Sequence, residues 1–305
     1  MIPRRERRAV HGIVLLNKPV GITSNTALQR VKRIFNAQKA GHTGNLDAPA
    51  SGLLPICLGE ATKITPFLLD ADKEYIARIR FGARTDTADA AGTVIETKPV
   101  PPLNELLVDQ ALARFLGDIE QVPPMYSALK VDGQRLYRLA AQGVSVERAA
   151  RAVNIRAIER LDLNSEYLEI RVSCSKGTYI RTLAEDIGAA LGTLAHVLTL
   201  HRSRVGPFCV GDGWTLEELE AHAQAGMLAL DACLIAMDKA LEHLPAVMLG
   251  VDASHFIMHG QAVRASAGQT EQILRLYDDR GRFIGIGAGL GDGRVAPRRL
   301  LNLSE

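Results

Sequence analysis

Apolar and polar positions alternate in two stretches of this chain, and each stretch predicts a β-strand with one buried face. The first covers residues 74–82, where one face carries Tyr75, Ala77, Ile79 and Phe81. The second covers residues 167–174, where the apolar face carries Leu168, Ile170, Val172 and Cys174. A shorter apolar run at residues 12–18 predicts a third strand.

Apolar residues spaced three or four positions apart predict helices in other parts of the chain. These helices are expected over residues 24–36, 104–115 and 180–191, and from residue 215 onward. The first places Leu28, Val31 and Ile34 on one face. The last begins with a capping box formed by Thr215 and Glu218. Strands and helices in this order predict an α+β protein.

The character of the sequence changes near Pro245. Short strand-like pieces at residues 272–277 and 283–288, together with many glycines, predict a small β-domain. We therefore expect two domains, residues 1–244 and residues 245–305. No low-complexity linker separates them.

The composition is typical of a globular protein, with 47% hydrophobic and 23% charged residues. No run of about 18 apolar residues is present, so we expect no membrane helix. The basic N-terminus precedes only a short apolar run, which argues against a signal peptide. The net charge is only +2, but basic residues gather in clusters, of which each alone is typical of a solvated face. Together the clusters are compatible with a polyanion lying across the surface.

The four cysteines are widely scattered, and no CxxC pair is present. This spacing argues against a zinc site or a disulfide framework and favours free thiols in a reducing cytoplasm. His42 is not part of an HxE or HExxH pattern, so we do not expect it to bind a metal. The sequence predicts a cytoplasmic protein without a metal or an organic cofactor.

A segment rich in glycine, threonine and proline surrounds a single carboxylate, Asp47. It runs from Gly41 to Pro55 and continues to Lys63. Glycines allow tight backbone turns that a substrate can approach closely, and loops on a rigid scaffold often carry chemistry. A lone aspartate in a loop is more often a turn former or a helix cap.

A second candidate segment, residues 174–183, joins a predicted strand to a predicted helix. It contains Tyr179 and Arg181 at the start of the helix, where anions are favoured. Arg181 can pair with an acidic group of the site or with Glu185, four residues further on the same helix. Residues 176–178 do not form a phosphate-binding P-loop, because the upstream glycine is absent.

These segments resemble the TruB family of pseudouridine synthases. The resemblance rests on GHTG at residues 41–44, on Leu46-Asp47 and on GLLP at residues 52–55, in order and spacing. The chain departs from the family at residues 48–51, where Ala-Pro-Ala-Ser replaces the usual Pro-Leu-Ala-Thr. Proline restricts itself and the residue before it, so a local change in the loop backbone is expected.

The resemblance implies an enzyme that isomerises a uridine in the T arm of tRNA (T loop, position 55) to pseudouridine. It implies that Asp47 is the nucleophile, that Arg181 orients it, that Tyr75 and Tyr179 hold the base and that Leu200 closes the pocket. Without the resemblance, Tyr75 and Leu200 would be interpreted as core residues. The implied fold is a mixed, largely antiparallel sheet with flanking helices and RNA-clasping insertions.

Further RNA contacts are also implied by the resemblance. His42 matches a histidine that inserts among T-loop bases, and Lys130 lies in a segment that matches an RNA-clasping loop. Lys18 matches an N-terminal lysine-proline signature, and Arg202 is expected to face backbone phosphate. The C-terminal residues loosely resemble a divergent PUA domain, a small RNA-binding β-barrel.

The implied partner is the T arm of tRNA, with no membrane and no obligatory protein partner. The implied reaction breaks an N-glycosidic bond, turns the base and forms a C–C bond, and a carboxylate nucleophile can perform it without a cofactor. Three alternatives stay open at this point: a dyskerin-like synthase that depends on a guide RNA, a non-catalytic module that folds tRNA, and a nucleotide-binding enzyme. The third lacks a complete phosphate loop in the sequence.

Overall fold

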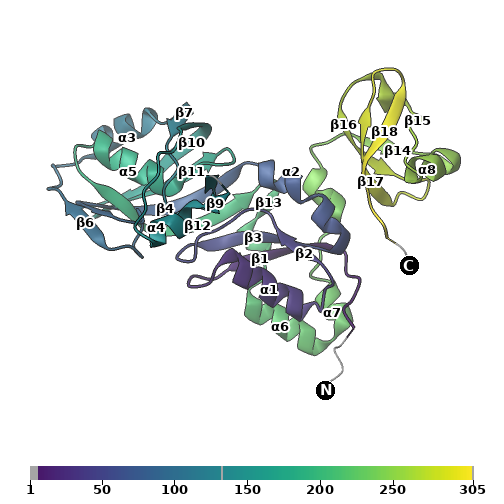
Figure 1. The fold of residues 1–305 in the computed structure, drawn as a ribbon, viewed down its shortest axis with the longest axis horizontal. Helices are drawn as coiled ribbons and strands as arrows, with labels where there is room; N and C mark the ends of the chain where they lie inside the picture. Colours follow the sequence, from purple (N-terminus) through teal and green to yellow (C-terminus); the bar gives the residue numbers. More distant parts are fainter. Residues whose placement is uncertain (1–5, 132, 304–305) are drawn as a thin grey trace.

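The computed structural model describes residues 6–131 and 133–303, and most of its strands belong to two sheets (Figure 1). The strands of the larger sheet are β1 (Gly12–Lys18), β2 (Ala40–His42), β3 (Ser51–Leu58), β4 (Lys73–Phe81), β7 (Gly117–Gln121), β10 (Arg151–Leu163), β11 (Tyr167–Cys174), β12 (Ala195–Val205) and β13 (Phe208–Cys209). They follow the order β1-β3-β12-β4-β11-β10-β7, with β2 beside β3 and β13 beside β12. Most neighbours are antiparallel, whereas β12 and β3 are parallel.

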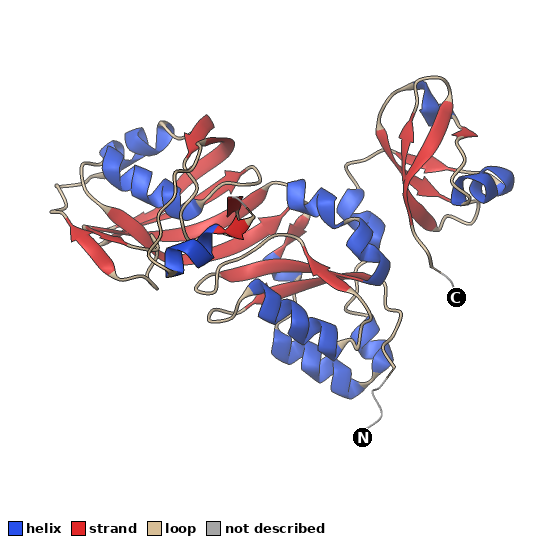
Figure 2. Cartoon of the chain, viewed as in Figure 1, coloured by secondary structure: helices blue, strands red, loops and turns tan. Residues whose placement is uncertain are grey.

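Helices cover the larger sheet in two groups (Figure 2). The helices of the chain are α1 (Ser24–Ile34), α2 (Thr65–Asp70), α3 (Glu105–Ala113), α4 (Leu136–Ala141), α5 (Ile180–Ala190), α6 (Leu216–Ala225), α7 (Met227–Asp231) and α8 (Val251–Met258). Short 3-10 turns are η1 (Gly59–Lys63), η2 (Val210–Asp212), η3 (Met237–Leu241) and η4 (Ser266–Gln269). Helices α3 and α5 share one core with β4, β10, β11 and β12, and α1 and α6 share another with β1 and β3.

The predicted alternation of β4 and β11 is confirmed. Ala77, Ile79 and Phe81 of β4 are buried, and so are the apolar side chains of β11. Their common core faces α5, whose Leu183 and Ile187 are fully buried. The four predicted helices and the strand at residues 12–18 are also present, with ends within a few residues of those expected.

Strand β3 was not predicted, because its residues form a continuous apolar run that contains Pro55. It is buried because its two faces lie in two different cores, Leu54 and Ile56 in one and Leu53 and Cys57 in the other, and β1 pairs with residues 52–58 along one edge. On the other side, the carbonyl of Pro55 accepts a hydrogen bond from the backbone of Thr43. The nitrogen of Pro55 faces the same edge of β3 as its carbonyl, past the last residue of β2. The missing N–H therefore costs the strand little in hydrogen bonds to its neighbour.

Two short hairpins project from the larger sheet. One pairs β5 (Ala83–Thr85) with β6 (Val94–Thr97), and the other pairs β8 (Lys130–Val131) with β9 (Gln134–Arg135). The resemblance identified residues 124–133 as an RNA-clasping loop. The second hairpin begins in that loop, and α4 follows the hairpin directly. We call residues 125–151 the clasp segment.

The C-terminal sheet has its own core and confirms a β-rich end of the chain. Its strands are β14 (Ala246–Met248), β15 (Val263–Arg264), β16 (Ile273–Tyr277), β17 (Phe283–Gly289) and β18 (Arg294–Leu300), in the order β14-β16-β17-β18-β15. The two outermost strands do not pair with each other within the described residues, so the sheet is a curled half-barrel. Lys63 Nζ donates to Leu300 O at 2.7 Å and fastens the end of this sheet to η1.

The fold is therefore the predicted α+β class, with a mixed, largely antiparallel main sheet. In the described part of the chain, no helix is both long and apolar enough to cross a membrane.

Candidate active site

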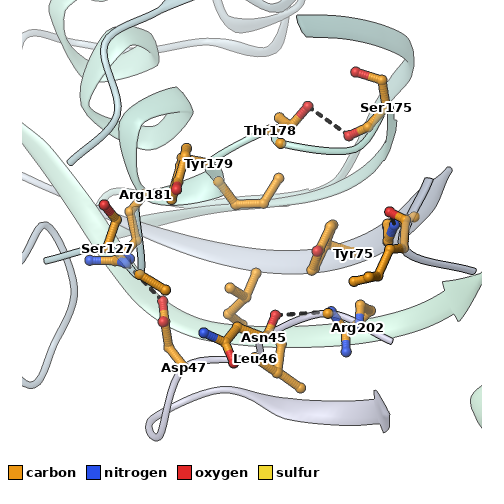
Figure 3. A pocket seen from close by; sticks show the side chains of 17 residues that line it. Asn45, Leu46, Asp47, Tyr75, Ser127, Ser175, Thr178, Tyr179, Arg181 and Arg202 are labelled. Carbon is orange, nitrogen blue, oxygen red and sulfur yellow. Dashed lines mark hydrogen bonds and ion pairs between the residues drawn. The ribbon is translucent and has the colours of Figure 1, made fainter. Parts of the chain in front are cut away.

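A cavity of about 270 Å³ lies where the loop before β3 meets β4, β12 and the start of α5 (Figure 3). Segments far apart in the sequence build it: the loop at residues 44–47, Tyr75 of β4, Leu200 of β12 and the junction at residues 177–181. Ser127 and Ala128 of the clasp segment also line it. The cavity thus collects most of the candidate residues found in the sequence.

Asp47 and Arg181 meet in this cavity. Asp47 Oδ2 lies 3.0 Å from Arg181 Nη2, and the arginine side chain is 6% exposed whereas that of the aspartate is 43% exposed. The carboxylate therefore keeps an open side toward the cavity while one of its oxygens is held. The ion pairs of Arg181 are with Asp47 and, at 4.0 Å, with Asp89, so the alternative pairing with Glu185 is not formed.

Arg181 is held by two further segments. Its Nη1 donates to Thr87 O at 2.9 Å, and its Nη2 donates to Tyr126 O at 2.8 Å. A guanidinium is planar and its donors are fixed in direction. These two bonds therefore fix the orientation of the Arg181 guanidinium, and with it the edge that faces Asp47. The arginine thereby joins α5, the clasp segment and the turn around Thr87 at one point.

The sequence departure after Asp47 is accommodated in a tight turn. Ala50 N–H donates to Asp47 O at 3.1 Å, and this bond closes residues 47–50. Ser51, at the end of the loop, bonds through Oγ to His201 Nδ1 at 2.9 Å. With proline at residue 49 rather than 48, the loop still directs Asp47 to Arg181.

Comparisons with known proteins match this chain to one family. Residues 32–180 match the family model "TruB family pseudouridylate synthase (N terminal domain)", and residues 181–242 and 245–301 match two TruB C-terminal domain models. tRNA pseudouridine synthase B of Stutzerimonas stutzeri (strain A1501) is 52% identical over 299 residues, covering 98% of both chains. The same-named protein of Pseudomonas aeruginosa (strain UCBPP-PA14) is 50% identical with the same coverage. This chain belongs to the TruB family.

The fold of this TruB-family chain is shared with a chain in the crystal structure of a Cbf5-Nop10-Gar1 complex. The two align with a TM-score of 0.74 and 27% sequence identity, over 97% of this chain and 85% of that chain. A chain in a structure of an H/ACA RNP bound to a substrate RNA containing 2'-deoxyuridine also aligns with a TM-score of 0.74, at 25% identity.

Tyr75, Tyr179 and Leu200 all line the cavity, as the resemblance implied for this TruB-family chain. Burial raises the pKa of the Tyr75 phenol, and the nearby Arg202 guanidinium opposes this effect. Burial also raises the pKa of Tyr179, partly offset by the hydroxyl of Ser127 and the charge of Arg181. Both phenols are therefore neutral near neutral pH.

Arg202, which was expected to face backbone phosphate, lines the cavity but is almost fully buried. Its side chain is 1% exposed, and its Nε donates to Leu53 O at 2.7 Å. Its Nη1 donates to Asn45 O at 3.2 Å, beneath the loop that carries Asp47 (Figure 3). These bonds support the loop from inside the protein, and the expected contact of Arg202 with the RNA backbone stays a prediction.

Lys18 is not among the residues that line the cavity. Its side chain is fully buried, and its Nζ donates to Pro19 O at 2.8 Å and to Ile22 O at 2.9 Å. Burial lowers the pKa of Lys18 to about 8, while Asp47 acts to raise it. Lys18 thus has a structural role in the turn before α1, and its expected contact with RNA stays a prediction.

His42 and Lys130 lie outside the set of residues that line the cavity. His42 is half-buried in β2, and burial lowers its pKa, with a smaller effect of Arg202 in the same direction. Lys130 is exposed in the hairpin of the clasp segment. Their expected RNA contacts stay predictions.

Sequence analysis missed Asp89, which is 7% exposed and lies behind Arg181. Its Oδ1 accepts hydrogen bonds from Thr87 Oγ1 at 2.6 Å and from Ala91 N at 3.0 Å. The available signal was an aspartate-rich, threonine-rich turn at residues 85–92 directly after a strand. Within the described residues, no cluster of three or more metal-ligating side chains occurs.

Proposed function

We propose that this protein converts a uridine in the T loop of tRNA, at position 55, to pseudouridine, with Asp47 as the nucleophile. The observation that carries the proposal is the half-exposed Asp47 carboxylate, paired with the buried Arg181 in a cavity of a TruB-family chain. The family relatives named above are tRNA pseudouridine synthases B, which supports tRNA as the substrate.

The reaction is an isomerisation, so the same atoms are present before and after. The bond from ribose C1' to N1 of uracil breaks, a bond from C1' to C5 forms, the C5 proton leaves and N1 gains a proton. A carboxylate can form a covalent bond to the substrate and be released in the last step. The paired Arg181 holds one carboxylate oxygen at 3.0 Å and so fixes the direction of the nucleophile for this step.

The cavity suits an everted pyrimidine. A base inside folded RNA must leave its stack to reach Asp47. Tyr75 and Tyr179 offer aromatic surfaces and Leu200 an apolar one, which is the kind of lining that accepts a flat base. Neutral phenols at these positions add no charge that would repel the RNA.

The clasp segment supplies positive charge for RNA beside the cavity. Lys130, Arg135, Arg138 and Arg151 are exposed, and none has a carboxylate within ion-pair distance in the described part of the chain. Tyr137, 40% exposed on α4, adds a surface for stacking. Unpaired cations near a stacking surface favour contact with a structured RNA such as the T arm.

The test is incubation of the purified protein with an unmodified tRNA transcript, without metal, cofactor or other protein, followed by chemical mapping of pseudouridine. We expect modification at the T-loop uridine, and none with the variant Asp47→Asn. Modification elsewhere, or an equally active Asp47→Asn protein, contradicts the proposal.

The same experiment separates the alternatives. A synthase that depends on a guide RNA and partner proteins, as the fold shared with Cbf5 allows, would leave the transcript unmodified until these were added. A non-catalytic folding module would bind tRNA without modifying it. We expect the protein alone to suffice, because its relatives named tRNA pseudouridine synthase B match it over nearly its full length. We also expect it to act in the cytoplasm.

A further inference from the structure

The backbone on both sides of Asp47 is bonded to the turn that leads into α1. Ser24 Oγ donates to Leu46 O at 2.9 Å and accepts from Leu46 N at 2.8 Å. On the other side of the aspartate, Gly21 N–H donates to Ala48 O at 2.8 Å. The residues immediately before and after the candidate nucleophile are thus fixed by Ser24 and Gly21. We call residues 18–22, which include Gly21, the N-terminal turn.

Ser24 is not needed to cap its own helix. The N-cap of α1 is Thr23, whose Oγ1 accepts from Thr26 N at 3.1 Å. Ser24, the first residue of the helix, is 2% exposed, and its hydroxyl is directed to the loop instead. A serine hydroxyl has one donor and two acceptor sites, so it can satisfy both the N–H and the C=O of Leu46 at once.

Leu46 transmits this constraint to the site. Its side chain is 5% exposed, and it is joined directly to Asp47. With its backbone held by Ser24 and the carbonyl of Asn45 held by Arg202, the loop has little freedom before the aspartate. The buried ammonium of Lys18 in turn holds the N-terminal turn through Pro19 O and Ile22 O.

From this geometry we infer that Ser24 is a positioning residue that aims Asp47 at the reacting carbon of the substrate. The inference rests on the proposed function, because it assumes that Asp47 is the nucleophile. Ser24 does not line the cavity, so it acts through the loop and not through contact with RNA. A nucleophile displaced by about 1 Å can lose roughly a hundredfold in rate.

The chain offers a matched control in the neighbouring Thr23. The variant Thr23→Ala removes the helix cap and destabilises α1, but leaves the bonds between Ser24 and Leu46 intact. We expect Ser24→Ala to lower the single-turnover rate at saturating tRNA by about ten- to a hundredfold, with KM unchanged. Thr23→Ala should lower the melting temperature and keep the wild-type rate. Ser24→Thr, which restores a hydroxyl, should recover most of the lost rate.

A second readout does not depend on catalysis. Hydrogen exchange of the peptide covering residues 43–50 should be faster in Ser24→Ala than in Thr23→Ala, because only the first frees the Leu46 amide. If loop exchange and rate in Ser24→Ala equal those in Thr23→Ala, the inference is overturned. It is also overturned if the loop is freed while the rate stays at the wild-type value.

The two proposals fail in different ways. A wild-type protein that leaves tRNA unmodified removes the proposed function, while the exchange experiment still decides whether Ser24 holds the loop. A wild-type protein that is active, with a rate insensitive to Ser24→Ala, removes only the positioning role.

Discussion

The buried cations in and behind the cavity differ in their hydrogen-bonding partners from three arginines on β10 and β11, namely Arg156, Arg160 and Arg171. Around the cavity, Lys18, Lys73, Arg181 and Arg202 are all at least nine-tenths buried. They donate mainly to backbone carbonyls, as Lys73 does to Leu68 O, Leu69 O and Ala71 O. On β10 and β11, Arg156, Arg160 and Arg171 bond to carboxylates, as Arg171 does to Glu159 at 2.6 Å.

This difference shows which charges organise the site. A cation bonded to carbonyls fixes the backbone without an acidic partner. Arg181 does this and also pairs with Asp47, whose carboxylate stays half-exposed toward the cavity. Each such charged bond contributes about 1.5–3 kcal/mol, because it is formed away from water. An exposed ion pair contributes about 0–1 kcal/mol. Substitutions in the two regions should therefore have very different effects.

The largest effect is expected at Arg181. The variant Arg181→Met should lower kcat by roughly a hundred- to a thousandfold, because Asp47 loses its partner and the carbonyls of Thr87 and Tyr126 lose a donor. Arg181→Lys keeps the charge but cannot reach three segments in fixed directions, so it should recover little. Single-turnover kinetics on a tRNA transcript measure both, and full recovery by lysine would show that charge alone matters.

Arg202 comes next, with an effect on stability as well as rate. Arg202→Met leaves the carbonyls of Leu53 and Asn45 buried without a donor. We expect a loss of about 2–4 kcal/mol in the free energy of unfolding and a lower kcat, since the loop before Asp47 loses its support. Urea denaturation and steady-state kinetics test this. A variant that weakens RNA binding with kcat and stability intact would instead support the expected contact with backbone phosphate.

The same contrast explains what the sequence could and could not predict. Strands β4 and β11 and helix α5 were predictable because each has one face in a shared core, and such burial leaves a periodic pattern. The position of Asp47 and its pairing with Arg181 could be inferred only from the family resemblance, since 134 residues separate them and no local pattern links them.

The buried cations could not be placed from sequence. Lys18 and Arg202 are of residue types usually found at the surface. The carbonyls that bind Lys18 lie one and four residues further along the chain, in a turn that has no periodic pattern, and those that bind Arg202 meet it only after β3 and β12 have paired. Asp89 was missed for a similar reason, because its role arises from a turn that the fold brings behind Arg181. Residue type alone cannot distinguish a charge that meets solvent from one that holds a loop.

A smaller, pH-dependent effect is expected at Lys18. Its folded pKa of about 8 lies below the ordinary 10.5, so burying the charged form costs stability. This cost is fully present below pH 8 and decreases as the pH rises from 8 to 10.5, because the unfolded chain then binds more protons than the folded one. The stability of the wild type relative to Lys18→Met should therefore rise with pH across this window. Chemical denaturation at several pH values measures the difference, and a pH-independent difference would contradict the assignment.

The smallest effect is expected at Arg171 of β11. Arg171 pairs with Glu159 across β11 and β10, and the two side chains are 42% and 59% exposed. The variant Arg171→Gln should change the free energy of unfolding by at most about 1 kcal/mol and leave kcat unchanged, because water and salt screen the pair. Denaturation at low and high salt, beside kinetics under the same conditions, checks both parts. A loss of activity comparable with that of Arg202→Met would mean that exposed arginines on β10 and β11 also organise the site. Burial would then not decide which cations matter for activity.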